Sequence, residues 1–177
     1  MQPSNDPNPA AAPDRREDRA DAIRLRPTGP GDLPALFEVQ TDPESNGMAG
    51  TKPRTREGFF AAWERHFSDP GINSRVIEID GQHGGEIVGT IGCFQADGRD
   101  SVGYWIARPH WGKGIASRAI EVFLREEPRR PLHATTALDN APSRRILEAC
   151  GFRCTGTRMG EETDRFVARE IAEYVLV

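Results

Sequence analysis

A strand that turns into a helix through a glycine-rich loop constrains this 177-residue chain more than any other feature. Residues 101–107 form a strand-like run, and Pro109 ends it because proline cannot donate to a sheet ladder. After the loop, apolar residues recur with helical period at Ile115, Ala116, Ala119, Ile120, Phe123 and Leu124. The pattern therefore predicts a helix that packs on the strand before it, as in α/β proteins.

The other hydrophobic runs extend this unit into a sheet. Upstream runs separated by Gly-rich turns, among them 80–85, indicate antiparallel hairpins, and a strand–helix–strand alternation follows. The predicted strands cover residues 23–26, 76–79, 86–94, 101–107, 132–136, 153–159 and 170–177. The predicted fold class is α/β, with a mixed, mostly antiparallel central sheet of about seven strands flanked by helices.

Two helices are expected before the hairpins. Asp32 can cap the first, and Thr55 can cap the second. The second carries an aromatic stripe at helical spacing, which we interpret as core or as a pocket wall: Phe59, Phe60, Trp63 and Phe67.

Composition sets the outer limits. The chain is 37% apolar and 28% charged, which is typical of a globular protein of one domain. Residues 1–21 are rich in Pro, Asp and Arg, so we expect a disordered tail followed by a domain over 22–177. A net charge of -4 argues against a nucleic-acid partner. Without a membrane-length apolar run or an apolar signal core, no membrane partner and a cytoplasmic location are expected.

The cysteines do not indicate a metal site or a disulfide framework. Cys93, Cys150 and Cys154 are odd in number, and no second ligand pair follows the C-x-x-x-C spacing of the last two. Cys93 and Cys150 fall on apolar faces, so we interpret them as small buried hydrophobic residues.

The glycine-rich loop is the strongest candidate for a ligand site. Backbone N–H groups at the start of a helix lack intrahelical partners and carry partial positive charge, and Gly112 and Gly114 would let an anion approach them. Lys113 is a possible additional cation. The loop has neither the P-loop nor the G-x-G-x-x-G spacing, so a pyrophosphate site competes with a turn that binds nothing.

A second motif lies in the helix over residues 139–150. Asp139 or Asn140 can cap this helix, Pro142 suits its first turn, and Gly151 supplies the stop. On this evidence Asn140 and Ser143 could be capping residues and nothing more.

Taken together, the two motifs resemble the GNAT acetyltransferases. Residues 111–116 read W-G-K-G-I-A and match the Q/R-x-x-G-x-G/A turn of that family except at its first position. Residues 140–152 match its N-x-x-S-x-x-x-L-E-x-x-G-F pattern. Trp111, together with the G-Y-W run at 103–105, is similar to the RimJ/RimL branch.

The resemblance implies acetyl-CoA as cosubstrate, no metal, and direct transfer of the acetyl group to a primary amine on a protein N-terminus or a small molecule. It implies that two strands splay to admit pantetheine, that Asn140 orients this arm, and that Ser143 is catalytic as a donor to the leaving thiolate or merely contacts CoA. The cofactor-binding set it implies is Trp105, Ile106, Ala107, Trp111, Gly112, Lys113, Gly114, Ile115, Ala116, Asn140 and Ser143. A homodimer is possible, and a non-catalytic CoA-binding sensor or partner module is the alternative function.

The acceptor side is less defined. Glu78 and Asp97 are candidate bases, against a solvated strand residue and a turn former, and a water chain or Tyr104 could serve instead. The acceptor pocket is expected to be built from residues 40–67 and the last hairpin. Its expected lining residues are Glu44, Asn46, Met48 and Trp63. His110 is expected to be an exposed loop residue, and Arg129 and Arg130 to form a solvated turn.

Overall fold

In a computed structural model, the protein folds around one seven-stranded sheet, in the order β1-β2-β3-β4-β5-β7-β6. The structure describes residues 23–81 and 84–177, so the tail predicted over 1–21 and its boundary lie outside the described residues. The strands are β1 (Ile23–Pro27), β2 (Asn73–Gly81), β3 (Gly84–Ala96), β4 (Arg99–Ile106), β5 (Leu132–Ala137), β6 (Arg153–Gly160) and β7 (Arg169–Leu176). All seven predicted strands are confirmed. The turn predicted over 80–85 shortens, because β2 and β3 extend into it.

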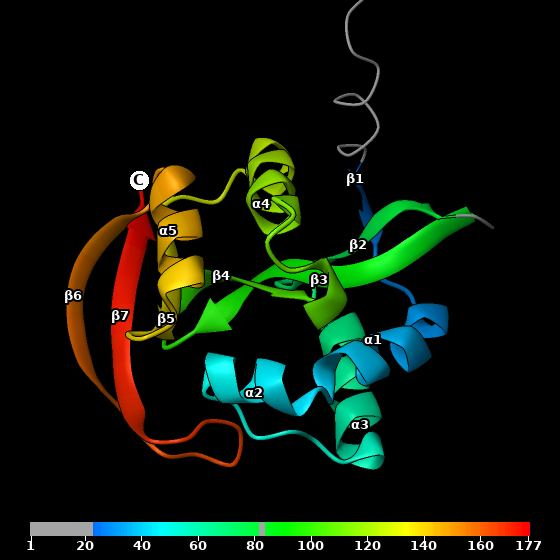
Figure 1. Cartoon of the computed structure of the whole chain (residues 1–177), viewed down its shortest axis with the longest axis horizontal. Coiled ribbons are helices and arrows are strands. Elements are labelled where there is room, and N and C mark those ends of the chain that lie inside the picture. The colour runs from blue at the N-terminus through cyan, green and yellow to red at the C-terminus, as the bar shows by residue number, and fades with distance from the viewer. Residues whose placement is uncertain (1–22, 82–83) are drawn as a thin grey trace, which may run out of the picture.

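Helices cover both faces of the sheet, as predicted (Figure 1). α4 (Ile115–Glu126) and α5 (Ala141–Ala149) lie on one face, and α1 (Leu33–Gln40) and α3 (Arg56–Ser68) lie on the other. A short helix, α2 (Pro43–Ala49), follows α1, and short 3-10 turns, η1 (Pro30–Asp32) and η2 (Arg108–His110), precede α1 and follow β4. The mixed α/β class is thus confirmed.

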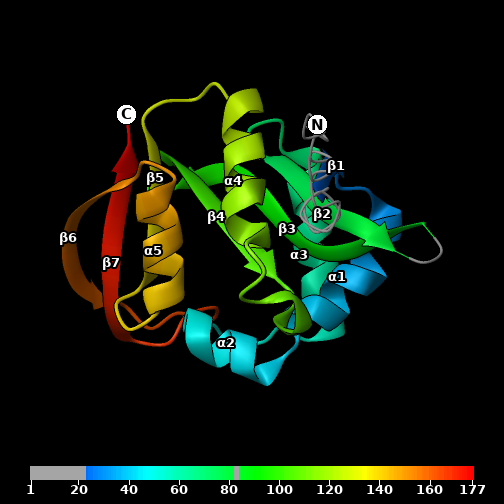
Figure 2. The ribbon, with the colours of Figure 1, turned by 45° about the horizontal axis from the view of Figure 1, so that its top comes forward.

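The sheet has one weak seam, between β4 and β5. β1 to β4 pair antiparallel, and so do β5, β7 and β6. β4 and β5 instead run parallel, and the register between them consists of Ser101 with His133. Beyond that pair the two strands diverge toward the end of β4, and α2 lies near the open end (Figure 2). The splayed pair of strands that the resemblance implied is therefore present.

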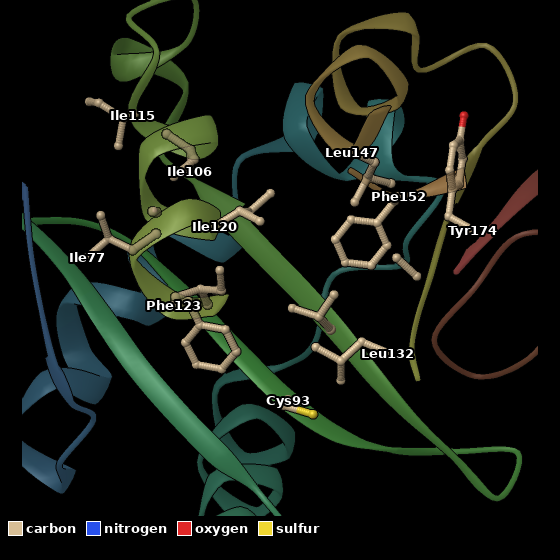
Figure 3. Packing of buried hydrophobic residues seen from close by; sticks show 14 of the residues in the cluster. Ile77, Cys93, Ile106, Ile115, Ile120, Phe123, Leu132, Leu147, Phe152 and Tyr174 are labelled. Carbon is tan, nitrogen blue, oxygen red and sulfur yellow. The ribbon is translucent and has the colours of Figure 1, made fainter. Parts of the chain in front are cut away.

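The main core lies between the sheet and the helices α4 and α5 (Figure 3). The predicted face of α4 supplies Ile115, Ala119, Ile120 and Phe123, all at most 7% exposed. Phe152 packs beneath α5, directly after the Gly151 stop. This packing fixes where α4 and α5 begin, and hence where their first-turn amides point.

A second cluster lies under α1 and α3. Phe59 and Trp63 are buried there, whereas Phe67 of the same aromatic stripe is 41% exposed, so the stripe is core only in part. Thr55 caps α3 as predicted, because its hydroxyl accepts a hydrogen bond from the amide of Gly58 at 3.1 Å.

Two local expectations are wrong. Asp32 stands at the N-cap of α1 but makes no cap bond to it; its carboxylate accepts from the Gly29 amide and from Arg26 instead. Arg129 is not in a solvated turn: its guanidinium donates to the buried carboxylate of Glu127 and to the Gly71 carbonyl. In both cases an ion pair, with Arg26 for Asp32 and with Glu127 for Arg129, engages a side chain that the local pattern assigns to a helix cap or to solvent.

Candidate functional site: a glycine turn and a split in the sheet

The turn before α4 is shaped for an anion. Gly112 and Gly114 have φ of 72° and 74°, a left-handed conformation that glycine adopts without strain. A Cβ built on either glycine would meet no atom within 4 Å, so the space in front of the turn is open. Glycine is required there by the backbone, and the resulting surface is free for a ligand to approach.

The first turn of α4 leaves its amides available. Gly114 is the N-cap, and no side chain caps the helix. The N–H groups of Ile115 and Ala116 therefore have no intrahelical carbonyl to pair with. Lys113 is exposed beside them, and the helix dipole adds partial positive charge. This arrangement can hold phosphate oxygens through backbone N–H groups.

Trp111 fixes the turn to the sheet. Its indole N–H donates to the Ile106 carbonyl at 2.8 Å, and the ring packs against the main core. The residue at the first position of the turn motif is thus a structural anchor between the turn and β4.

The backbone of β4 distinguishes the three residues predicted to meet pantetheine. The Ala107 amide donates to Val88 of β3 at 2.8 Å, and its carbonyl accepts from the His110 amide, so both of its backbone groups are engaged. Because alternate strand residues direct N–H and C=O to opposite neighbours, Trp105 also faces β3, where it pairs with Thr90. Ile106 and Tyr104 face the diverging side, toward β5.

α5 presents the second motif at this opening. The side-chain oxygen (Oδ1) of Asn140 accepts a hydrogen bond from the Ser143 backbone amide at 3.1 Å, so Asn140 does cap the helix. Its side-chain NH₂ group forms no hydrogen bond with any described residue and can serve a ligand as well. Capping and cofactor binding are therefore compatible at Asn140.

A hydrogen bond joins β4 to α5 beside the split between β4 and β5. The Tyr104 hydroxyl lies 2.9 Å from the Ser143 hydroxyl, and both side chains are partly buried. Burial raises the pKa of Tyr104 above its ordinary value, although the Ser143 bond opposes the rise. Tyr104 is thus a protonated phenol at neutral pH. Local patterns could not predict this pairing, because 39 residues separate the two positions.

α2 closes the far end of the split. Arg108, just after β4, forms ion pairs with Asp42 at 3.1 Å and Glu44 at 3.2 Å. Arg169 of β7 donates to the Gly47 carbonyl at 2.9 Å. The α2 segment is therefore bound to both sides of the opening.

The residues suggested for the acceptor lining are mostly engaged within the protein. Asn46 is 3% exposed. Its side-chain NH₂ group donates to the carbonyls of Gln40 and Asp42, and its side-chain oxygen accepts from the Thr51 hydroxyl. Trp63 is 5% exposed and belongs to the second core cluster. Met48, which is partly exposed, and Glu44, which is exposed and paired with Arg108, are the suggested residues that a substrate can reach.

Neither carboxylate suggested as a base lies at the split. Glu78 sits on β2, bound to Arg24 and Arg26, and these bonds lower its pKa despite burial. Asp97 lies in the β3–β4 turn, at the opposite end of β4 from Ile106, with φ of 51°. The turn-former interpretation of Asp97 is confirmed, and Glu78 is structural rather than solvated.

Several other groups near the site have defined surroundings. His110 is only 14% exposed, contrary to expectation: its Nε2 lies 3.2 Å from Glu86, and its buried Nδ1 has no partner among the described residues. The three cysteines are free, with Cys93 buried and Cys154 exposed. Within residues 23–81 and 84–177, no group of three or more His, Cys, Asp or Glu could hold a metal, and no helix could span a membrane.

Comparison with known proteins identifies the family. Residues 22–153 match the model of the acetyltransferase (GNAT) domain. The chain is 32% identical over 143 residues to an uncharacterized N-acetyltransferase, p20, of Bacillus licheniformis, and the match covers 76% of this chain and 80% of that protein. The chain belongs to the GNAT acetyltransferase family and is an N-acetyltransferase.

Solved structures share the fold at low identity. A Vibrio cholerae spermidine N-acetyltransferase in complex with CoA and spermine has a TM-score of 0.75 at 18% identity, covering 87% of this chain and 94% of that one. Mycobacterium smegmatis RimJ in complex with CoA-disulfide has a TM-score of 0.69 at 23% identity, covering 89% and 83%. The microcin C7 self-immunity acetyltransferase MccE, in complex with acetyl-CoA and AMP, has 0.72 at 19%, covering 89% and 93%. The predicted GNAT-like fold is confirmed.

Proposed function

We propose that this enzyme takes its acetyl group from acetyl-CoA and transfers it to a primary amine by direct attack in a ternary complex. The observation that carries the proposal is the Tyr104–Ser143 hydrogen bond, which joins β4 to α5 beside the split between β4 and β5. It places two hydroxyl groups at the opening in the sheet, at the end of β4 that leads into the glycine turn.

The donor side follows from the backbone. The open glycine turn and the uncapped start of α4 bind the pyrophosphate. Pantetheine lies along the diverging edge of β4, and the free NH₂ group of Asn140 orients it. Solved GNAT structures that hold CoA or acetyl-CoA support this donor.

Chemistry requires stabilisation of an oxyanion and of a leaving thiolate. As the amine nitrogen attacks the thioester carbon, the Ile106 N–H, which faces the split, donates to the carbonyl oxygen, a bond worth about 3 kcal/mol in such sites. The C–S bond then breaks, and the Ser143 hydroxyl donates to the thiolate. The Tyr104 phenol, protonated at neutral pH, donates in turn to Ser143. It regains its proton from water, which takes up the proton that the amine nitrogen loses as the amide forms.

The acceptor must lose a proton before it attacks. An alkyl amine of pKa near ~10 is neutral about one time in a thousand at pH 7, a penalty of roughly 4 kcal/mol. Because Glu78 is held by two arginines and Asp97 lies at the wrong end of β4, a water chain to backbone carbonyls is the proposed route. A terminal α-amine, with pKa near ~8, requires less assistance.

We place the enzyme in the RimJ/RimL-like branch. The W-G-K-G-I-A turn and the preceding G-Y-W strand support this placement, and the Mycobacterium smegmatis RimJ likeness supports the fold. The similar proteins that act on spermidine and on microcin C7 make small amines as reasonable as protein N-termini. A homodimer is also proposed, since β6 is an edge strand exposed along seven of its eight residues.

Thiol release tests the function. The protein is incubated with acetyl-CoA and a panel of amines, and free CoA is measured over time. Amine-dependent release supports the transferase. Tight acetyl-CoA binding without release from any amine would instead support a non-catalytic CoA-binding sensor or partner module.

A further inference from the structure

Two arginines from distant parts of the chain share one crevice on the acceptor side of the molecule. Arg54 precedes α3, and Arg165 lies in the loop between β6 and β7. The loop is held in this position because the Lys52 amide donates to the Arg165 carbonyl, the Arg165 guanidinium donates to the Lys52 carbonyl, and Thr51 forms a bridge with Phe166. The crevice is lined by Phe37, Gln40, Thr41, Arg54, Phe59 and Arg165.

Neither arginine has a carboxylate partner within the described part of the chain. The Arg165 guanidinium donates to the Lys52 carbonyl, and Arg54 forms no hydrogen bond or ion pair with a described residue. Burial lowers the pKa of both groups, that of Arg165 to about 10, and Arg54 lowers the pKa of Arg165 further. The pKa of His66 is lowered chiefly by burial and then by the positive charges of Arg54 and Arg65. The charge of Arg54 therefore also acts on His66.

Two other partly buried arginines of this protein are neutralised by carboxylates. Arg26 binds the carboxylates of Asp32 and Glu78, and Arg129 binds Glu127. Two half-buried guanidiniums that line one crevice, with no acidic partner among the described residues, are unfavourable, because desolvation and like-charge repulsion both oppose the charged forms. An anion from outside the chain would remove this cost.

The crevice adjoins the end of the split in the sheet. Gln40 and Thr41 directly follow Val39, whose carbonyl accepts the Trp105 indole N–H at 3.1 Å. Trp105 itself follows Tyr104 on β4, so the crevice lies behind the wall that faces the proposed reaction centre. α1 and α3, which supply Phe37 and Phe59 of its lining, lie on the side of the sheet opposite α4 and α5 (Figure 1).

We propose that Arg54 and Arg165 bind an anionic group, a carboxylate or a phosphate, of a small-molecule acceptor whose other end carries the amine. This inference rests on the proposed function and narrows its acceptor to an amine with a negative charge at a distance. The crevice is too narrow to admit a water molecule, so the anion binds at its mouth. There, every guanidinium nitrogen without a hydrogen bond remains open to solvent.

The geometry suits an oxyanion and rejects a polycation. Planar guanidinium groups match the paired oxygens of carboxylate and phosphate. Phe37 and Phe59 line the crevice behind them and limit competing hydration. A polyamine brought to the same wall would meet two uncompensated positive charges.

Matched acceptors test the proposal in the full-length protein. Ethanolamine, phosphoethanolamine, β-alanine, β-alanine amide and putrescine are compared as acceptors, with kcat/KM taken from free CoA release. The variants are Arg54→Gln and Arg165→Gln, and Arg125→Gln on the exposed last turn of α4 is the control. Binding of inorganic phosphate to wild type and to the double variant is measured separately by calorimetry.

Wild type is expected to prefer an anionic acceptor over its uncharged counterpart by at least tenfold. Each crevice variant should raise the KM for the anionic acceptor about 10–100-fold, the range of a charge-assisted hydrogen bond. Neutral acceptors, the acetyl-CoA KM and the control should not change. Equal activity on charged and uncharged acceptors, or equal losses for both in the variants, would overturn the proposal.

The calorimetry separates this proposal from the proposed function. Phosphate binding that the double variant loses, with no thiol release from any amine, would support the anion site and reject the transferase. Thiol release from neutral amines or putrescine that both variants retain, with no phosphate binding, would support the transferase and reject the anion site.

Discussion

The proposed donor side of this protein is built mainly from backbone groups, and the proposed acceptor side mainly from side chains. The donor side uses backbone: two left-handed glycines, an uncapped helix start and an exposed strand edge, all within residues 104–116. The acceptor side uses side chains carried together from α1, α2, α3 and the β6–β7 loop; Lys52, for example, binds Glu162 and the Thr163 carbonyl across 110 residues or more. Backbone sites are local and tolerate sequence change, whereas side-chain sites can diverge and set specificity.

The largest expected effect breaks the donor side alone. Gly114→Glu places a carboxylate where phosphate binds and forces a residue with a Cβ to φ of 74°. We expect acetyl-CoA binding to weaken at least 100-fold by calorimetry. Gly98→Glu is the matched control, because Gly98 has φ of 71° and equally open surroundings at the far end of β4. If Gly114→Glu binds like the control, the turn is not the phosphate site.

The next effect concerns the chemistry between the two sides. Tyr104→Phe and Ser143→Ala should each lower kcat about 10–100-fold and change the acetyl-CoA KM little, because both act on the leaving thiolate. In a double-mutant cycle the losses should not add, since the hydroxyls act as one unit. Additive losses, or a kcat that is unchanged in Ser143→Ala, would contradict the proposed proton path.

A buried carboxylate should make the fold acid-sensitive. Glu127 caps the end of α4, is 2% exposed and binds Arg129 and Asn73. The Arg129 bond, chiefly, lowers its pKa from 4.5 to about 2. The ionised form therefore stabilises the fold fully above pH ~4.5, and this contribution is lost as the pH falls toward 2. Denaturant titrations should show Glu127→Gln destabilised by about 2 kcal/mol at pH 7, with a flatter pH dependence between 4.5 and 2.

The smallest effect has the opposite sign. Arg54→Gln removes a half-buried cation without an acidic partner, so we expect the free protein to gain about 0.5 kcal/mol, after allowance for solvent screening. That gain corresponds to a Tm about 1–2 °C higher. Arg125→Gln on the surface should leave Tm unchanged. A lower Tm for Arg54→Gln would mean that Arg54 stabilises the acceptor side rather than burdening it.

Sequence patterns predicted most of the fold because its elements are local. The seven strands, α3, α4 and α5 follow from periodicity and from capping residues such as Thr55 and Gly151. Periodicity predicts no separate helix at α2, since Pro43–Ala49 is short, polar and contains a glycine. Its stability comes instead from tertiary contacts such as that of Arg169 with the Gly47 carbonyl.

The parts of the candidate site that lie in contiguous motifs could be predicted from the sequence, as could the local elements of the fold. The glycine turn and Asn140 form contiguous motifs, so their placement could be anticipated. The contact of Tyr104 with Ser143, the burial of His110 and the crevice of Arg54 and Arg165 depend on which segments meet in space. No period or spacing along the chain carries that information.

The single register pair between β4 and β5 has a further consequence, for the dynamics of the free enzyme. The amides of Tyr104 and Ile106, which lack a neighbouring strand, should exchange hydrogen with solvent much faster than amides at the centre of the β2–β3 ladder. A bound cosubstrate that occupies this edge would protect them and stabilise the native state by mass action. The sheet is then two half-sheets that the cosubstrate joins, and the enzyme should be stiffest when it is loaded for reaction.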